Sequence, residues 1–404
     1  MIMRKTTKRI LSCILLATAC LALNLSVAAL NPGDLIDHVL ATDIRAFIDG
    51  YEIPSYNING KLGIVAEDLR GYGFDVVWNG DDRTLSISRN AYKVTSPAEI
   101  SEKNTAPIGT KIEPVLFTDI VTYLEGAQVE SFNIGGRTII YFSNISKYGT
   151  YLYDDNARAS MISYDNHDFK TITLPELPQK IIHGGGEVGF YLGSNSLEAL
   201  NNTHSKGFRV IELDFMLSSD GKPVCIHNWS QYYSNQLGSV PVTAAEFANV
   251  KIFNRFTALT LDSLVKWMVL HPDVYIVTDV KEDNVNMLRH IALAHPEIIG
   301  RIIPQIYQYD EYVPVRAMGY SNILLTLYRL PTYFDKVNSK YNAEFAKKHR
   351  LLGVTADATL ANQKFVDTYV AAGVPLFVHT INDAEEQQKF FDIGVTGIYT
   401  DYAK

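Results

Sequence analysis

The chain has 404 residues, of which 47% are hydrophobic and 20% charged, as in an ordinary globular protein. That length provides for two or three domains. With 36 basic and 44 acidic residues the formal net charge is −8, which argues against nucleic acid as a partner, because neutralising phosphates requires a basic surface.

Residues 1–29 have the pattern of a secretory signal peptide. Four basic residues precede an apolar run from Ile10 to Leu23, which is short for a membrane span. The small residues Ser26 and Ala28 form a cleavage site before Ala29. We therefore expect a secreted or cell-envelope protein, with an uncleaved membrane anchor as the alternative.

Residues 30–92 and 107–164 are predicted to be two copies of one small α+β unit. Matched positions include Thr42-Asp43-Ile44 with Thr118-Asp119-Ile120, Asn57-Ile58 with Asn133-Ile134, and Arg83 with Arg158. In the first copy, Asp49-Gly50 and Asn59-Gly60 predict hairpin turns between short strands. Ile64 to Tyr72 predicts a short helix that ends at Gly73.

This half resembles the copper amine oxidase N-terminal-like stalk domain of bacterial envelope proteins. The similar segments are IDGYEI, VAEDLRGYGF, VVWN and RTLSIS. The resemblance implies a folding and spacing module. Contact with a cell-wall polymer is a weaker alternative, in which tyrosines such as Tyr51, Tyr56 and Tyr72 would stack on sugars.

Residues 179–404 alternate short β-rich runs with helix-like stretches, the pattern of a parallel (β/α)8 barrel. Nine strand-like runs compete for eight places, so Val224 to His227 is expected to form a hairpin extension. A doubly wound open sheet is the runner-up. It requires a phosphate loop, and Gly184 to Gly186 lack the GxGxxG spacing of such a loop.

Polar residues follow most of these runs, and in a barrel the strand ends carry the chemistry. The candidates are His183, Glu212, Asp214, His227, Asp279, Lys281, Gln305, His379 and Asp401. Glu212 and Asp214 are two residues apart, so in a strand they share a face. Two inward carboxylates repel unless a cation lies between them. We expect a hard divalent ion there, with Asp279 as third ligand. The alternative is a buried cluster balanced by Lys281 or Arg209.

His183 and His227 are the predicted catalytic pair. Beside a carboxylate site, two histidines suit acid/base work better than zinc binding. One would take a proton from the attacking hydroxyl or water, and the other would protonate the leaving oxygen.

Residues 180–403 resemble the glycerophosphodiester phosphodiesterase family, within the larger group that includes phosphatidylinositol-specific phospholipase C. The similar motifs are IIHGGG, NSLEAL, VIELDF, SSDGKPVCIHN, IVTDVK, FVHTIND and GIYTDY. The resemblance implies a TIM barrel, a Ca²⁺ or Mg²⁺ ion on Glu212, Asp214 and Asp279, and phosphodiester cleavage by His183 and His227.

The resemblance also implies that Lys281 meets the phosphate. Gly184 stands where the family usually has an Arg that reaches phosphate, and its backbone amide is expected to substitute in part. Gly193-Ser194-Asn195 replaces the usual Pro-Glu-Asn, and Asn228 replaces an Asp. Asp279 stands where Glu is common. His379 replaces a usual Trp and, with Gln305, is a predicted substrate-binding residue.

The predicted function is metal-dependent hydrolysis of a glycerophosphodiester or phospholipid head-group diester, giving an alcohol and a phosphomonoester. Attack by water and attack by a substrate hydroxyl, through a cyclic phosphate, both stay open. The rival hypothesis is a non-catalytic envelope binding protein on a degenerate barrel. A metal-dependent glycosidase is disfavoured because it needs two free carboxylates rather than two histidines.

Overall fold

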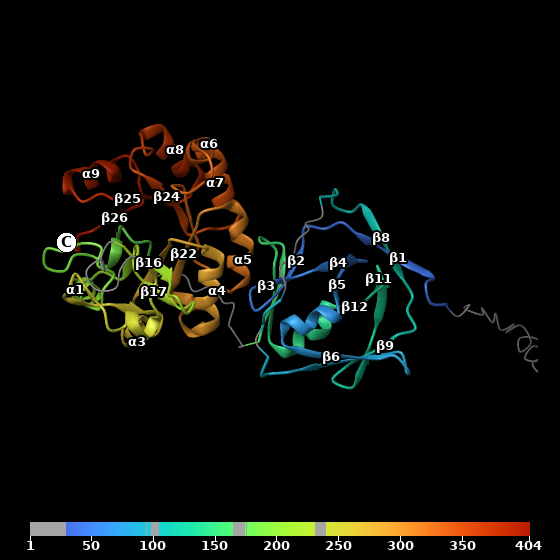
Figure 1. Ribbon diagram of the computed structural model, residues 1–404. Coiled ribbons are helices and arrows are strands. Elements are labelled where there is room, and N and C mark those ends of the chain that lie inside the picture. Colours follow the sequence, from blue (N-terminus) through green and yellow to red (C-terminus); the bar gives the residue numbers. More distant parts are fainter. Residues whose placement is uncertain (1–29, 94, 98–104, 165–173, 175, 231–239) are drawn as a thin grey trace, which may run out of the picture.

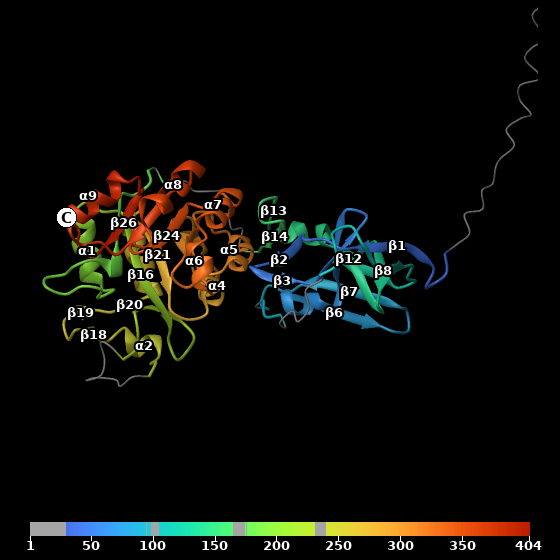
Figure 2. The same ribbon diagram turned by 90° about the horizontal axis from the view of Figure 1, so that it is seen from above.

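The computed structural model describes residues 30–93, 95–97, 105–164, 174, 176–230 and 240–404. It consists of an amino-terminal β-rich domain and a carboxyl-terminal barrel, which lie side by side (Figure 1; Figure 2). The predicted signal peptide falls outside the described residues, as do most of residues 165–175. In the described part of the chain, no helix combines the length and the apolar character that crossing a bilayer requires.

The amino-terminal domain repeats one series of elements. The first copy comprises β1 (Leu35–Leu40), β2 (Arg45–Ile48), β3 (Tyr51–Ile53), β4 (Ser55–Ile58), β5 (Lys61–Val65), the 3-10 helix η1 (Glu67–Tyr72), β6 (Phe74–Asn79) and β7 (Thr84–Arg89). The second comprises β8 (Lys111–Leu116), β9 (Val121–Leu124), β10 (Ala127–Val129), β11 (Ser131–Ile134), β12 (Arg137–Tyr141), η2 (Phe142–Tyr148), β13 (Thr150–Asp154) and β14 (Ala159–Ser163).

The predicted helix over Ile64 to Tyr72 is shorter than expected. Ile64 and Val65 belong to strand β5, and only Glu67–Tyr72 is helical. Both residues are fully buried, and their burial in the strand overrides the helical pattern. Gly73 ends the helix in the left-handed conformation, φ 81°, as the sequence indicated.

The two copies are interwoven. The small closed barrel has the strand order β1-β4-β5-β12-β11-β8, and the flanking sheets have the orders β10-β9-β7-β6 and β13-β14-β2-β3. Every one of these sheets takes strands from both copies. β5 and β12 pair so that Ile64 faces Ile140, which occupies the same position in the other copy. Neither copy therefore completes a sheet of this domain by itself.

Residues that identify the repeat also join the copies. Arg83 of the first copy pairs with Asp119 of the second, Nη2 to Oδ1 at 2.6 Å. Arg158 of the second pairs with Asp43 of the first at 3.0 Å. These two ion pairs are equivalent under the exchange of copies, so the sequence match reflects a pseudo-twofold arrangement.

The carboxyl-terminal domain is a closed barrel of eight parallel strands, surrounded by helices. The strands are β15 (Lys180–Ile182), β16 (Val210–Leu217), β21 (Tyr275–Val280), β22 (Ile302–Ile306), β23 (Leu324–Thr326), β24 (Gly353–Asp357), β25 (Leu376–His379) and β26 (Gly397–Thr400). The longer helices are α1 (Leu197–Ser205), α3 (Leu261–Leu270), α4 (Asn284–Ala294), α5 (Tyr312–Ala317), α7 (Ser339–Lys348), α8 (Gln363–Ala372) and α9 (Ala384–Asp392). The short ones are α2 (Ala244–Phe247), α6 (Tyr333–Val337), η3 (His183–Gly185), η4 (Pro296–Arg301) and η5 (Tyr309–Glu311).

The closed barrel confirms the predicted (β/α)8 fold and excludes the open doubly wound sheet. Val224 and its neighbours form β17 (Pro223–Cys225), which pairs antiparallel with the end of β16 as the expected hairpin extension. β20 (Leu259–Thr260) continues this extension, and β18 (Lys251–Ile252) pairs with β19 (Phe256–Thr257) beside it.

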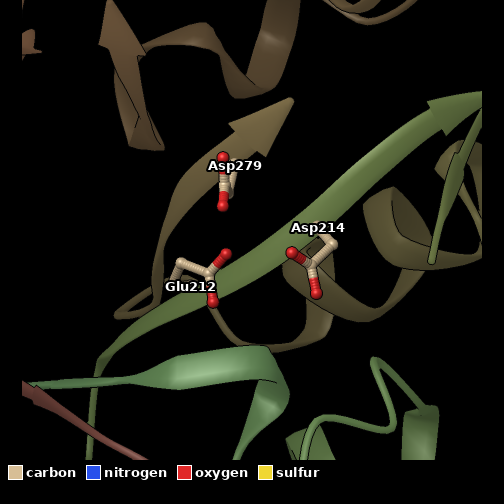
Figure 3. Close-up of side chains that lie close together, drawn as sticks. All are labelled: Glu212, Asp214 and Asp279. Atoms are coloured by element: carbon tan, nitrogen blue, oxygen red, sulfur yellow. The ribbon is translucent and has the colours of Figure 1, made fainter. Parts of the chain in front are cut away.

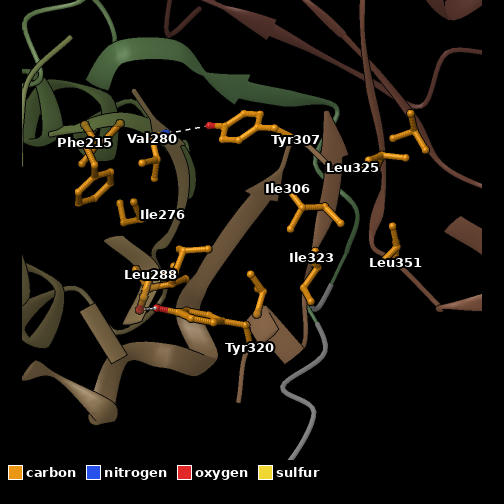
Figure 4. Close-up of a cluster of buried hydrophobic side chains, with 14 of the residues drawn as sticks. Phe215, Ile276, Val280, Leu288, Ile306, Tyr307, Tyr320, Ile323, Leu325 and Leu351 are labelled. Atoms are coloured by element: carbon orange, nitrogen blue, oxygen red, sulfur yellow. Dashed lines mark hydrogen bonds between the residues drawn. The ribbon is translucent and has the colours of Figure 1, made fainter. Parts of the chain in front are cut away.

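The core between strands and helices is apolar. Figure 4 shows Phe215, Ile276 and Ile306 from the strands against Leu288 of α4, and the buried Tyr320 hydroxyl donates to the Leu288 carbonyl at 2.8 Å. This layer fixes each strand with one face toward the helices. The other face then lines the barrel interior.

An apolar layer also fills the lower barrel interior, the half nearer the amino ends of the strands. Its members are Ile181, Val210, Val277, Ile303, Leu324, Phe377 and Tyr399. Because strand side chains alternate, the residue two positions later points inward again, nearer the strand's carboxyl end. Those residues are His183, Glu212, Asp279, Gln305, Thr326, His379 and Asp401. The barrel interior is therefore apolar below and polar above.

Candidate active site

Three carboxylates from two neighbouring strands converge in the polar upper layer. Glu212 and Asp214 come from β16 and Asp279 from β21, and their side chains face one another (Figure 3). One oxygen of each lies within 4.8 Å of those of the other two. Glu212 is 1% exposed and Asp214 2%. Three buried negative charges at this spacing require positive charge between them.

Glu212 shows that requirement most clearly. Burial raises the pKa of its carboxyl, and the charge of Asp214 raises it further. Oε2 accepts a hydrogen bond from the Gly184 N–H at 2.7 Å. Oε1 is buried and has no hydrogen-bond partner among the described residues. An orphaned carboxylate oxygen facing two other carboxylates fits a cation ligand.

Asp214 is held by Asn195, the residue before the N-cap of α1. The Asn195 side-chain amide donates to Asp214 Oδ2 at 2.8 Å, and its carbonyl accepts the Asp214 N–H at 2.9 Å. This reciprocal pair ties the loop after β15 to β16 and sets the orientation of the carboxylate. The sequence analysis did not predict this contact.

Lys281 lies among the carboxylates. Its Nζ is 2.7 Å from Asp214 Oδ1 and 2.6 Å from Asp279 Oδ2. The Tyr307 and Tyr328 hydroxyls donate to the other oxygen of Asp279 at 2.6 and 2.8 Å. Burial raises the pKa of Asp279, but Lys281 and these hydrogen bonds outweigh it and lower the pKa overall. Lys281 therefore balances the negative charge of Asp214 and Asp279, two of the three carboxylates. The alternative interpretation, a buried cluster balanced by a basic side chain, required such a contact.

His183 begins the loop after β15 and is oriented by Asp401. Its Nδ1 lies 2.7 Å from Asp401 Oδ1, and its Nε2 lies 3.9 Å from Glu212 Oε2. Burial lowers the pKa of His183, but the charge of Glu212 and the hydrogen bond with Asp401 outweigh it and raise the pKa to about 9. Asn382 holds Asp401 in turn, donating from Nδ2 at 2.6 Å and accepting the Asp401 N–H at 2.9 Å.

His227 stands apart from this group. It follows β17, is exposed, and its Nδ1 lies 3.0 Å from Nδ2 of Asn228. The preceding residue, Ile226, donates its N–H to the Asp214 carbonyl at 3.0 Å. His227 therefore follows directly after a residue that is bonded to the strand of Glu212 and Asp214. Among the described residues, no hydrogen bond or ion pair joins its ring to His183 or to the three carboxylates.

Gly184 occupies a position that excludes a side chain. Its φ is +57°, and a Cβ there would lie 2.6 Å from the Cα of Gly193. The arginine of the related motif therefore cannot be placed on this backbone without moving the Gly193 segment. Because the Gly184 N–H already donates to Glu212, this amide is engaged within the protein.

Gln305 and His379 line the cavity beside His183, Glu212 and Asp279. The Gln305 amide donates to the Thr278 carbonyl at 3.1 Å, and its Oε1 accepts from Thr326. Burial lowers the pKa of His379, which favours the neutral imidazole, and its buried Nε2 has no hydrogen-bond partner in the described part of the chain. Their roles toward a substrate stay predictions.

Sequence reasoning placed His183, Glu212, Asp214, Asp279 and Lys281 together, and the structure brings them together. It named Asp401 among the strand-end candidates without a role, and it did not assign Asn382, Asn195, Tyr307 or Tyr328. Asp401 directly follows the last barrel strand, β26, and that position was the available signal. The oxygen-only donors suit a hard divalent cation such as Ca²⁺ or Mg²⁺ better than a softer metal.

The barrel domain matches the model of a known protein family. Residues 183–404, more than half of the chain, match the family model of the Glycerophosphoryl diester phosphodiesterase family. Comparison with curated proteins finds no match. Among solved structures, a putative glycerophosphoryl diester phosphodiesterase from Silicibacter pomeroyi is 17% identical, with TM-score 0.47, and the match covers 57% of this chain and 91% of that one.

Two further structures have similar coverage. A phosphodiesterase from Oleispira antarctica, in complex with the product sn-glycerol-3-phosphate, is 19% identical with TM-score 0.46, covering 56% of this chain and 94% of that one. A glycerophosphodiester phosphodiesterase from Thermotoga maritima is 19% identical with TM-score 0.43, covering 56% and 96%. The match to the family model identifies this chain as a phosphodiesterase that belongs to the glycerophosphoryl diester phosphodiesterase family.

Proposed function

We propose that the barrel hydrolyses a glycerophosphodiester or a phospholipid head-group diester, giving an alcohol and a phosphomonoester. A divalent cation, Ca²⁺ or Mg²⁺, would be held by Glu212, Asp214 and Asp279. The observation that carries the proposal is the convergence of these buried carboxylates with an oriented imidazole, His183, whose Nε2 lies 3.9 Å from Glu212.

The cation, when bound, stabilises negative charge that develops on the phosphoryl oxygens. The chain's own part is positional. Asn195 and the Gly184 N–H fix Asp214 and Glu212, and Tyr307 with Tyr328 fix Asp279. Ligands held on barrel strands keep their geometry while a substrate binds and leaves.

His183 moves one proton in this proposal. Its Nδ1–H donates to Asp401, which leaves Nε2 directed at the carboxylates and hence at a diester bound there. His227 is the proposed second proton-transfer group. His227 is exposed just after β17, and the residue before it, Ile226, is hydrogen-bonded to the Asp214 carbonyl. This location supports the proposal that its ring reaches a bound diester from the mouth of the cavity. Water and a substrate hydroxyl are both compatible nucleophiles.

The test is hydrolysis of glycerophosphocholine with Ca²⁺ or Mg²⁺ by the wild type, His183→Ala, His227→Ala and Glu212→Ala. Each substitution is expected to reduce kcat roughly 10²-fold or more, because each removes a proton-transfer group or a cation ligand. His38→Ala and Glu130→Ala, in the amino-terminal domain, are the matched controls and should retain activity. Equal rates for the wild type and the site variants, across several diesters, would contradict the proposal and favour a binding protein.

We also propose that the protein is exported, because basic residues, an apolar run and small residues follow one another over residues 1–29. Fractionation of expressing cells is expected to find it outside the cytoplasm, and amino-terminal sequencing to start after Ala28. Recovery in the cytosol with an intact amino terminus would contradict export.

A further inference from the structure

Lys281 holds the position that a divalent cation would need. Its Nζ bridges Asp214 Oδ1 at 2.7 Å and Asp279 Oδ2 at 2.6 Å. We infer that Lys281 and the divalent cation compete for these two carboxylates, so that cation binding frees the Lys281 ammonium to pair with the substrate phosphate. The inference rests on the proposed function, because it requires the cation site.

The competition follows from distance. A Ca²⁺ ion lies roughly 2.3–2.6 Å from its oxygens and Mg²⁺ about 2.0–2.1 Å. The three carboxylates offer oxygens within 4.8 Å of one another. An ammonium and a divalent ion bound to the same oxygens would lie a few ångströms apart in a buried site, where like charges repel strongly. One of them must therefore withdraw.

Lys281 can withdraw without disturbing the barrel. Its backbone N–H donates to the Phe215 carbonyl at 3.1 Å, which anchors the main chain at the end of β21. Its side chain is 19% exposed, so the ammonium can reach the mouth of the site. The flexible stem of lysine allows that movement while the strand stays in place.

The neighbouring residues explain why the freed ammonium is needed at the phosphate. Gly184 cannot carry a cationic side chain, since its Cβ would lie 2.6 Å from the Gly193 Cα. The Arg329 guanidinium is occupied, because it donates to the Val280 carbonyl at 2.5 Å and stacks on Tyr307 at 4.4 Å. When Asp214 and Asp279 bind the cation, the Lys281 ammonium loses its two ion pairs and can pair with the phosphate instead. Cation and phosphate binding would then be coupled reciprocally.

The test measures binding rather than turnover. Ca²⁺ and Mg²⁺ are titrated calorimetrically into the full chain after EDTA treatment and dialysis, for the wild type, Lys281→Met and Lys281→Gln. Both variants are expected to bind the cations about tenfold more tightly or better, because no ammonium must be displaced. Lys93→Met, which removes an ion pair with Asp75 in the other domain, should match the wild type.

A second readout is thermal unfolding. Without added cation, both Lys281 variants should melt below the wild type, because three carboxylates are left unbalanced. Ca²⁺ should raise their Tm by more than it raises that of the wild type. In the third arm, inorganic phosphate is titrated with and without saturating Ca²⁺, and the Ca²⁺-dependent gain in phosphate affinity should be smaller in Lys281→Met than in the wild type.

The outcomes separate the two proposals. Cation affinity in the Lys281 variants that equals or falls below the wild-type value overturns the competition and leaves the cation site intact. An equal Ca²⁺-dependent gain in phosphate affinity overturns the transfer of Lys281 to phosphate. Failure of Ca²⁺ and Mg²⁺ to bind any form, including the wild type, overturns the cation site and the competition with it.

Discussion

Individual residues around His183 are held by a short chain of hydrogen bonds. Asp401 accepts from the imidazole, and Asn382 engages both a carboxylate oxygen and the backbone N–H of Asp401. Asp401 thereby keeps a proton on Nδ1 and directs Nε2 of His183 toward the carboxylates. Its contribution to hydrolysis would be made through His183, so it is a positioning residue.

Asp401→Asn is expected to reduce kcat roughly 10²-fold with little change in KM. The amide can present Nδ2–H to His183 and favour the other tautomer, whereas substrate contacts are unchanged. Steady-state kinetics on glycerophosphocholine measures both constants, and circular dichroism checks the fold. A variant with unchanged kcat would show that the orientation of His183 does not depend on this carboxylate.

Gly184→Ala is expected to lower the free energy of unfolding by about 1–3 kcal/mol more than Gly189→Ala does. Both glycines have positive φ, 57° and 61°, but a Cβ at Gly184 meets the Gly193 Cα at 2.6 Å, whereas one at Gly189 has no atom within 4 Å. Urea denaturation of both variants isolates the steric contribution. Equal losses would mean that the Gly193 segment moves aside at little cost.

The residue-level predictions succeeded where local spacing carried the information. Glu212 and Asp214 are two apart in one strand, so their shared face could be derived from the sequence. The partnership of His183 with Asp401 could not, because the two residues are 218 positions apart. The place of Lys281 between two carboxylates also depends on side-chain conformation, which spacing does not specify.

At the level of elements, the alternation of strand side chains determines how far along the barrel strands the site lies. A residue of the apolar layer, such as Val210 or Val277, comes two positions before Glu212 or Asp279. The same alternation allowed the sequence to predict that Glu212 and Asp214 point inward. Strand pairing within the amino-terminal half was not predictable in this way, because each copy contains enough strands to suggest an independent unit.

Because the two copies of the amino-terminal domain are interwoven, we expect them to fold cooperatively as one unit. A fragment of residues 30–92 is expected to lack a stable fold, because β2, β5 and β7 each pair with a strand of the other copy. Residues 30–164 should fold cooperatively. Circular dichroism with urea denaturation of both fragments provides the measurement. A cooperative transition of residues 30–92 as a monomer would contradict this expectation.

For the molecule as a whole, the two domains share one apolar cluster. Phe47 and Met161 of the amino-terminal domain are buried with residues of the barrel. Beside them, Arg316 Nε of α5 lies 2.8 Å from Asp154 Oδ2, and the two side chains are 12% and 10% exposed. The sequence predicted two repeat units and a barrel but not this contact, because an interface depends on which surfaces meet in space.

Arg316→Ala and Asp154→Ala are each expected to destabilise the full chain by about 3 kcal/mol, since each leaves a buried charge without its partner. The double variant should lose clearly less than the sum. Urea denaturation of the single and double variants gives the coupling. Arg83→Ala, from the exposed pair with Asp119, is the control and should have a much smaller effect. Strict additivity at the interface would contradict the role assigned to this pair.

The symmetric pairing of β5 with β12 and of β1 with β8 has a further consequence. Because equivalent strands face each other, the amino-terminal domain has the geometry of an isologous homodimer whose two subunits are joined in one chain. Joining them replaces a concentration-dependent association with an intramolecular one. The domain can therefore assemble at any dilution and presents the barrel with one fixed partner surface, formed by both subunits of that internal dimer.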